Sequence, residues 1–357
     1  MLDCYGKCSP FRLEASGPTE DALKILAQSG LNTVRLRLWV NPSAHTPHGW
    51  PTDDYSYANL TSVLALARRL RDAHLDLWLD FHYSDGWSDP KQQTKPALWS
   101  KLSLSHLQHA VYNHTLSALE ALTAQGTPPT IVQVGNEIDN GMLWAESDQQ
   151  CSDGGALYRP GCIDESKASQ GNWPAFASLV SAGVRAVRKA APQAEIMIHT
   201  ALANEKDIAD IVAWYQNLVS AGARDWDMIG LSFYSFFGAG NTSVIPKFSA
   251  LTTAFHGKRV VLAETAYHYQ YGNTRQFPPT PAGQLAYIQT VLVELHALPG
   301  GGGVAWWGAE YYNFTSGAGW TGLWDQQAVA LPALTLGWQH QHQPQHRHQP
   351  QHQHQPQ

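Results

Sequence analysis

Two glutamates each close a short apolar run, and paired carboxylates are the groups that general acid/base or nucleophilic chemistry requires. Glu137 ends the run 131–136, and Glu264 ends the run 260–263. Either one alone is more simply read as a helix cap or as a partner of an arginine. Both together, with Asn136 directly before the first, favour a catalytic pair.

The runs that position these glutamates recur regularly along the chain and alternate with amphipathic stretches. The stretch 57–73 has apolar residues at helical spacing, and 19–29, 105–125 and 174–190 also favour helices. Strands that alternate with helices predict a parallel sheet. The expected fold is therefore an α/β (β/α)₈ barrel whose strands are 32–40, 75–82, 130–137, 195–199, 227–234, 259–264 and 303–307.

These runs number seven, one fewer than a closed barrel needs. Residues 1–17 show no alternating pattern, so we expect the first strand to be missing or degenerate, as a truncated amino terminus would explain. Glu137 and Glu264 would then end strands four and seven, which face each other across a barrel. Two inward carboxyls could lie about 5 to 5.5 Å apart there, as retaining glycoside hydrolysis requires.

The composition excludes several classes of function. Only 15% of the residues are charged and the net charge is −6, so no basic face is available for nucleic acid. No apolar run reaches the ~18–20 residues of a membrane helix. The 14 Trp and 14 Tyr are abundant, and flat rings of this kind pack in cores or stack on sugars.

Alternation along the strands sorts the polar side chains by face. Arg35, Arg37 and Trp39 share one face of the first visible strand. Asp80 shares a face with His82, which we expect to order the substrate or Arg37 and not to bind a metal. Ser232 and Tyr234 share a face of a later strand, opposite its apolar residues.

Several ordered motifs resemble those of glycoside hydrolase family 53, over about residues 19 to 325. They are the segments 32–42 (NTVRLRLWVNP), 80–90 (DFHYSDGWSDP), 132–138 (VQVGNEI), 227–234 (DMIGLSFY) and 261–267 (VLAETAY). The resemblance implies an endo-acting, retaining β-1,4-galactanase that cleaves galactan side chains of pectin. It implies a polysaccharide partner and no cofactor, and the loop 267–281 lacks the acidic cluster of a calcium site.

The resemblance also assigns roles to individual residues. Glu137 would be the acid/base, Glu264 the nucleophile, and Asn136 the ligand of the sugar 2-hydroxyl. Arg37 and Tyr234 would hydrogen-bond the nucleophile. The motif-matched stacking rings are Trp87, Trp144 and Trp307, with Asp85 as a nearby hydroxyl acceptor.

One segment departs from the family pattern. The last strand commonly continues as Trp-Glu-Pro in the family, whereas this chain reads Trp307-Gly308-Ala309-Glu310. Alternation along the strand does not separate Trp306 from Trp307 as the inward ring.

Four Asn-x-Ser/Thr sites and four cysteines favour a secreted, glycosylated monomer whose signal peptide is not in this sequence. The sites are Asn59, Asn113, Asn241 and Asn313, and the spacing permits the disulfides Cys4–Cys8 and Cys151–Cys162. Residues 339–357 contain almost only Gln, His and Pro, which predicts a disordered tail after a catalytic domain of residues 1–338.

Two other functions fit the same residues. A mannanase or cellulase of the same clan would share both glutamates and differ in its subsite walls. A catalytically silent sugar-binding barrel would fit the missing strand and the altered segment after Trp307, but would not need both Glu137 and Glu264.

Overall fold

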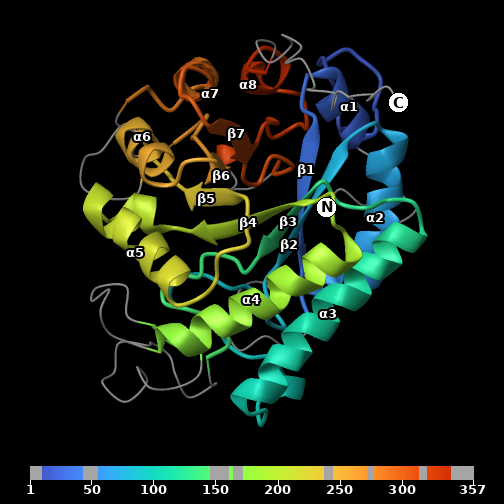
Figure 1. The fold of residues 1–357 in the computed structure, drawn as a ribbon. Helices are drawn as coiled ribbons and strands as arrows, with labels where there is room; N and C mark the ends of the chain where they lie inside the picture. Colours follow the sequence, from blue (N-terminus) through green and yellow to red (C-terminus); the bar gives the residue numbers. More distant parts are fainter. Residues whose placement is uncertain are drawn as a thin grey trace, which may run out of the picture.

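The computed structural model describes residues 10–42, 55–144, 161–163, 172–236, 244–271, 276–312 and 320–338. In these residues seven parallel strands form one curled sheet in sequence order (Figure 1). The strands are β1 (Thr33–Leu38), β2 (Asp76–Phe81), β3 (Ile131–Val134), β4 (Glu195–Thr200), β5 (Met228–Ser232), β6 (Arg259–Thr265) and β7 (Gly301–Trp306). This architecture confirms the predicted barrel fold.

Helices lie on the outside of the curled sheet and connect successive strands (Figure 1). Side-chain N-caps start several of them: Asn59 accepts the amide of Ser62, and Ser103 accepts that of His106. The α-helices are α1 (Ala22–Gln28), α2 (Leu60–Asp72), α3 (Leu104–Ala124), α4 (Trp173–Ala190), α5 (Ile208–Ser220), α6 (Ile245–Ala254), α7 (Pro281–His296) and α8 (Pro332–Thr335). The 3₁₀ turns are η1 (Tyr55–Ala58), η2 (Ala97–Trp99) and η4 (Leu202–Asn204).

Within the described residues, β1 and β7 form the two edges of the sheet and do not pair with each other. Both strands are only half-buried, whereas the strands between them are almost completely buried. Near these edges the two ends of the described chain meet, because Arg12 pairs with Val329 and the Phe11 ring packs on Trp324. The expectation of a missing or degenerate first strand agrees with this arrangement.

Side chains alternate between the barrel interior and the helix layer, as expected for strands covered on both faces. A small interior cluster fills the barrel below the site, formed by Trp78, Met197, Met228, Val261 and Ala263. Residues of opposite parity, such as Leu77, Leu79 and Phe81, join the main core under the helices. The interior cluster therefore forms a floor beneath the polar residues at the carboxyl ends of the strands.

Some sequence-based expectations fall on residues outside the described ranges. These include the tail 339–357, Asn241, Asn313, Cys4, Cys8 and Cys151. Cys162 is disulfide-bonded and buried. Asn113 is exposed on α3. In the described part of the chain, every helix is too short or too polar to cross a membrane.

Candidate active site

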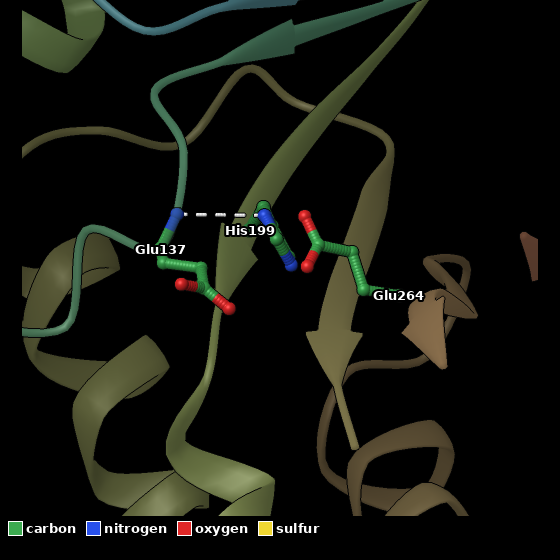
Figure 2. A group of neighbouring side chains, drawn as sticks. All are labelled: Glu137, His199 and Glu264. Atoms are coloured by element: carbon green, nitrogen blue, oxygen red, sulfur yellow. Dashed lines mark hydrogen bonds between the residues drawn. The ribbon is translucent and has the colours of Figure 1, made fainter. Parts of the chain in front are cut away.

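Three ionisable side chains converge at the carboxyl ends of the strands: Glu137, which follows β3, His199 from β4 and Glu264 from β6 (Figure 2). One oxygen or nitrogen atom of each lies within 4.8 Å of the others. The two carboxylates are thus much closer than the roughly 6.5 to 9.5 Å found in inverting glycosidases. Their separation fits direct attack by one carboxylate on a substrate that the other protonates.

A register shift in β6 turns Glu264 into the barrel. Val261 and Ala263 already point inward, so strict alternation would place the next residue under the helices. The pairing of β5 with β6 moves from Leu231–Leu262 to Ser232–Glu264 at this point. Such irregularities redirect side chains and are common beside active sites. Glu264 is 7% exposed and faces Glu137.

The backbone bends sharply where Glu137 is presented. Gly135 has φ +86°, and a Cβ added there would lie 2.6 Å from the Ile138 side chain. Glu137 itself has φ +46°, a left-handed conformation that non-glycine residues seldom adopt. Backbone strain of this kind persists only where the surrounding contacts hold it. The bend directs the Glu137 carboxyl toward Glu264 (Figure 2).

Two donors hold the Glu264 carboxylate. Arg35 Nη1 lies 2.6 Å from Oε1, and the Tyr234 hydroxyl donates to Oε2 at 2.8 Å. Burial and the charges of Glu264 and Glu137 raise the pKa of Tyr234 well above its usual value, so the hydroxyl remains a donor. The arginine also pairs with Asp80 at 2.9 Å. Glu264 is therefore held by one positive charge and two hydrogen bonds.

The predicted contact of Arg37 with Glu264 is therefore wrong. Arg35 and Arg37 lie on the same face of β1, and alternation cannot say which one reaches the depth of the carboxylate. The Arg37 guanidinium instead lies over the ring of Trp87, 4.0 Å from its centroid, with Trp39 at 5.6 Å. Among the described residues it has no hydrogen-bond acceptor and no carboxylate partner. Its donors are free to bind a ligand.

His82 and Asp85 organise the loop after β2. His82 Nε2 lies 3.1 Å from Asp80 Oδ2, and Nδ1 accepts the amide of Ser88. His82 thus holds Asp80, which pairs with Arg35. The expected partner of His82 was the substrate or Arg37. Asp85 accepts the backbone amides of Asn41 and Ala97, each at 2.9 Å. Its carboxylate joins two loops, with one backbone amide on each oxygen.

The three predicted stacking rings differ in accessibility. Trp87 and Trp307 are half-buried, and Trp307 meets Tyr234 edge-on at 6.4 Å. Trp144 is only 2% exposed, and its indole N–H donates to the Asn140 carbonyl. The prediction that Trp144 offers a stacking face is wrong, because its ring is buried and packs against Cys162.

The structure separates the two tryptophans at the end of β7. Trp306 points outward, where its indole donates to the Thr321 carbonyl and its ring packs near Tyr287. Trp307 points toward Tyr234, and Tyr311 packs against it at 5.3 Å. Gly308 has φ +67°, and a Cβ there would lie 2.6 Å from the Tyr311 ring. The departure after Trp307 is thus a tight turn that folds an aromatic ring back against the site.

Asn136 occupies the centre of a polar network. Its Oδ1 accepts from Arg35 Nη2 at 2.7 Å, and its Nδ2 donates to the Ser88 carbonyl at 2.8 Å. Gln133 also bonds Arg35 Nε at 3.0 Å. One amide hydrogen of Asn136 is left for a substrate hydroxyl, because an NH₂ group has two donors.

His199 was not found by the sequence reasoning. It is completely buried, with Nε2 2.9 Å from Ser232 Oγ and Nδ1 3.4 Å from the amide nitrogen of Glu137. Burial and the charge of Arg35 lower its pKa well below the usual value, so it is neutral. The signal was present in the run 195–199, which ends with this polar residue as the other two runs end with Glu137 and Glu264.

Glu137 and Glu264 differ in their surroundings. Burial, and then the negative charge of Glu264, raise the pKa of Glu137 well above that of an ordinary glutamate. Glu264 has Arg35 and Tyr234 as donors. The two carboxyls thus lie in different environments, as a proton donor and a nucleophile require.

Glu137, His199 and Glu264 could also be considered as metal ligands, because their donor atoms are close together. However, both nitrogens of His199 are already in hydrogen bonds, and both oxygens of Glu264 have donors. A metal ion would therefore have to compete with these hydrogen bonds and with the positive charge of Arg35. The arrangement fits carboxylate-pair chemistry better than metal binding.

The model of glycosyl hydrolase family 53 matches residues 7–336. The chain belongs to this family. An arabinogalactan endo-β-1,4-galactanase of Thermothelomyces thermophilus is 31% identical over 338 residues, which cover 90% of this chain and 91% of the relative.

Two solved structures extend the similarity to family 53 folds. A structure of fungal β-1,4-galactanases superposes with a TM-score of 0.76 at 29% identity and covers 93% of this chain and 94% of that one. The family 53 catalytic domain of Ignisphaera aggregans gives 0.74 at 28% identity, with coverage of 90% and 88%.

Proposed function

We propose that the protein is an endo-acting, retaining hydrolase of β-1,4-galactan in which Glu264 is the nucleophile and Glu137 the acid/base. The observation that carries this proposal is a pair of carboxyl groups with oxygens within 4.8 Å of each other. Arg35 and Tyr234 hold one of them, and burial and the charge of its neighbour raise the pKa of the other. Galactanase-named relatives supply the substrate class.

In the first step, a Glu264 oxygen attacks the anomeric carbon while Glu137 gives its proton to the leaving glycosidic oxygen. This forms a covalent galactosyl ester and releases the aglycone. Loss of its proton leaves Glu137 as a carboxylate. In the second step this carboxylate removes a proton from water, which attacks the same carbon and releases Glu264. Two inversions give net retention.

The surrounding residues support binding of the sugar at the point of cleavage. The remaining donor of Asn136 is placed to bind the 2-hydroxyl next to Glu264, a contact that strengthens as the transition state gains oxocarbenium character. Trp307 offers a ring beside Tyr234. Trp87 and the free guanidinium of Arg37 offer a second binding surface at the mouth of the barrel.

Action outside the cell fits the same function, since the substrate is a plant cell-wall polymer. The exposed Asn113 sequon and the disulfide at Cys162 support a secreted glycoprotein. We expect a monomer that needs no cofactor.

Hydrolysis of defined polysaccharides tests the proposal. The protein should release reducing ends from potato galactan and lower its viscosity early in the reaction, as an endo-acting enzyme does. It should release none from mannan or carboxymethyl-cellulose. Activity on either of these would favour the rival β-glycanase, and binding of galactan without cleavage would favour a sugar-binding barrel.

A further inference from the structure

His199 contacts the backbone of Glu137. The Glu137 amide donates to Nδ1 at 3.4 Å (Figure 2), and the Gln133 side-chain amide lies 3.0 Å from the same nitrogen. Arg35 Nη2 lies 3.5 Å from this nitrogen as well, and Asn136 Oδ1, 3.1 Å away, already accepts from Arg35 and Gln133. The N–H groups directed at Nδ1 therefore favour a ring nitrogen that accepts and carries no proton. In a neutral imidazole the proton must then be on Nε2.

The other ring nitrogen leads to the carboxyl of the same glutamate. His199 Nε2–H donates to Ser232 Oγ at 2.9 Å, so the serine hydroxyl is free to donate its own proton onward. Ser232 acts on the Glu137 side chain and favours its ionised form, as a hydroxyl that donates to the carboxylate would. Through one buried histidine and one buried serine, both ends of Glu137 are therefore held.

The charged groups around His199 and Glu137 lower the pKa of the histidine and raise that of the glutamate. Arg35 and His82 act on His199, and both oppose its protonation. Glu264, Asp139 and Asp89 act on Glu137, and all three oppose its ionisation. Ser232 acts in the opposite direction, because its hydroxyl favours the carboxylate.

We propose that His199 and Ser232 form a positioning pair for Glu137, in which the histidine fixes the strained backbone through Nδ1 and orients the serine hydroxyl onto the carboxyl through Nε2. This proposal rests on the proposed function, since it assigns the acid/base role to Glu137. Neither residue touches the substrate or exchanges a proton with it. The Ser232 proton stays on its oxygen, while the catalytic proton passes from Glu137 to the leaving oxygen and returns to Glu137 from water.

The pair would matter in both steps. In the first step the Glu137 carboxyl must point at the leaving oxygen, and a residue with φ +46° depends on its contacts to keep that direction. In the second step the carboxylate must persist long enough to activate water, and the serine hydroxyl lowers the cost of its charge beside Glu264. Loss of the hydroxyl should therefore misplace the acid and raise its pKa.

The test compares Ser232→Ala with Ser235→Ala. Both serines are buried and only three positions apart, but the Ser235 hydroxyl has no hydrogen-bond partner in the described part of the chain. We expect Ser232→Ala to lower kcat/KM on galactan at least about tenfold, because a positioned acid contributes roughly 10²–10⁴. The basic limb of its kcat/KM against pH, which reports the loss of the Glu137 proton, should move to higher pH. Ser235→Ala should change neither.

An aryl galactoside with a dinitrophenolate leaving group separates positioning from general damage. Its first step needs no proton, so kcat/KM for Ser232→Ala should stay within about threefold of the wild type. Equal losses on both substrates with an unmoved basic limb would reduce the serine to a structural role and overturn the proposal. No loss on either substrate would overturn it as well.

Two histidine variants test the two contacts of His199 separately. In His199→Asn the amide can take the place of Nδ1 and keep the Glu137 backbone contact, while the donor to Ser232 is lost. In His199→Gln the amide can take the place of Nε2 and keep that donor. We expect the Asn variant to reproduce the shifted basic limb and the Gln variant to lose rate without the shift.

The same limb shift in both histidine variants would contradict the two-ended arrangement. Failure of the proposed function looks different, because the wild-type protein would then not cleave galactan at all.

Discussion

Arg35 Nη1 lies 2.6 Å from Glu264 Oε1, whereas the guanidinium of Arg37, two residues further along β1, lies against Trp87. Arg35 also bonds Asn136 and pairs with Asp80, which His82 holds in turn. One arginine is thus committed to the carboxylates inside the barrel. The other presents free donors at its mouth, so the two should have different effects when replaced.

Replacement of Arg35 should damage both stability and chemistry. In Arg35→Met, Asp80 and Glu264 would stay buried without their counter-charge, which costs about 3–5 kcal/mol when one partner of a buried pair is removed. We expect a clear drop in Tm and a loss of at least about 100-fold in kcat/KM on galactan and aryl galactosides alike. Thermal unfolding and kinetics on both substrates check this. A variant with wild-type kcat/KM would show that Glu264 needs no positive partner.

Replacement of Arg37 should affect only longer substrates. The charges of both Arg37 and Glu264 act on Tyr311, so Arg37 lies close to the nucleophile's side of the site. We therefore expect it to bind the galactosyl unit next to the one that is cleaved. Arg37→Gln should lower kcat/KM on an aryl galactobioside about tenfold, equivalent to ~1.4 kcal/mol.

The matched substrate is the aryl galactoside, which lacks that unit and should react at the wild-type rate. Tm should also be unchanged. If both substrates lose activity equally, Arg37 acts at the point of cleavage and the subsite is misassigned.

The sequence predicted the fold more completely than it predicted the contacts in the site. Strand and helix periods predicted every strand of the described sheet, because burial on alternating faces leaves a strong pattern. How deep a residue of β1 lies in the barrel leaves no such pattern in the sequence. The sequence therefore could not show whether Arg35 or Arg37 contacts Glu264. Glu264 points inward only because of a register shift, which depends on how β5 and β6 pair and not on either run alone.

The surroundings of two other residues are set by segments that lie far away in the sequence. Trp144 is buried against Cys162, and its backbone pairs with Thr94, 50 residues earlier in the chain. His199 acquires its role only when Glu137 and Ser232 arrive from neighbouring strands. Neither contact leaves a local pattern.

The raised pKa of Glu137 predicts a stability difference that depends on pH. A glutamate whose folded pKa is raised stabilises the fold while protonated, and this contribution is lost as pH rises through the folded pKa. Glu137→Gln mimics the protonated form and should therefore have a higher Tm than the wild type above that pKa. The gap should close at pH 4 and below. A gap that widens toward low pH would contradict the raised pKa.

Removal of residues 339–357 should leave both Tm and activity on galactan unchanged. A segment of Gln, His and Pro offers almost no apolar surface to pack against the barrel. Differential scanning calorimetry of the shortened and full chains makes the comparison. A drop of several degrees would mean that the tail is part of the folded domain.

The roles of the two glutamates can be told apart by azide. Glu264→Ala should nearly abolish turnover of every β-galactoside, because no ester can form. Azide can then enter from the vacated side and attack the anomeric carbon directly, so the restored product should be the inverted α-galactosyl azide.

Glu137→Ala should behave differently, because Glu264 can still attack. A dinitrophenyl galactoside needs no protonation, so its first step should keep a substantial rate while cleavage of galactan falls by about 10²–10⁴. Azide should then replace water in the second step and give the β-galactosyl azide, since two inversions have occurred. Product configuration by proton NMR distinguishes the cases. An exchange of these signatures would reverse the two roles, and normal activity of both variants on galactan would exclude this pair from catalysis.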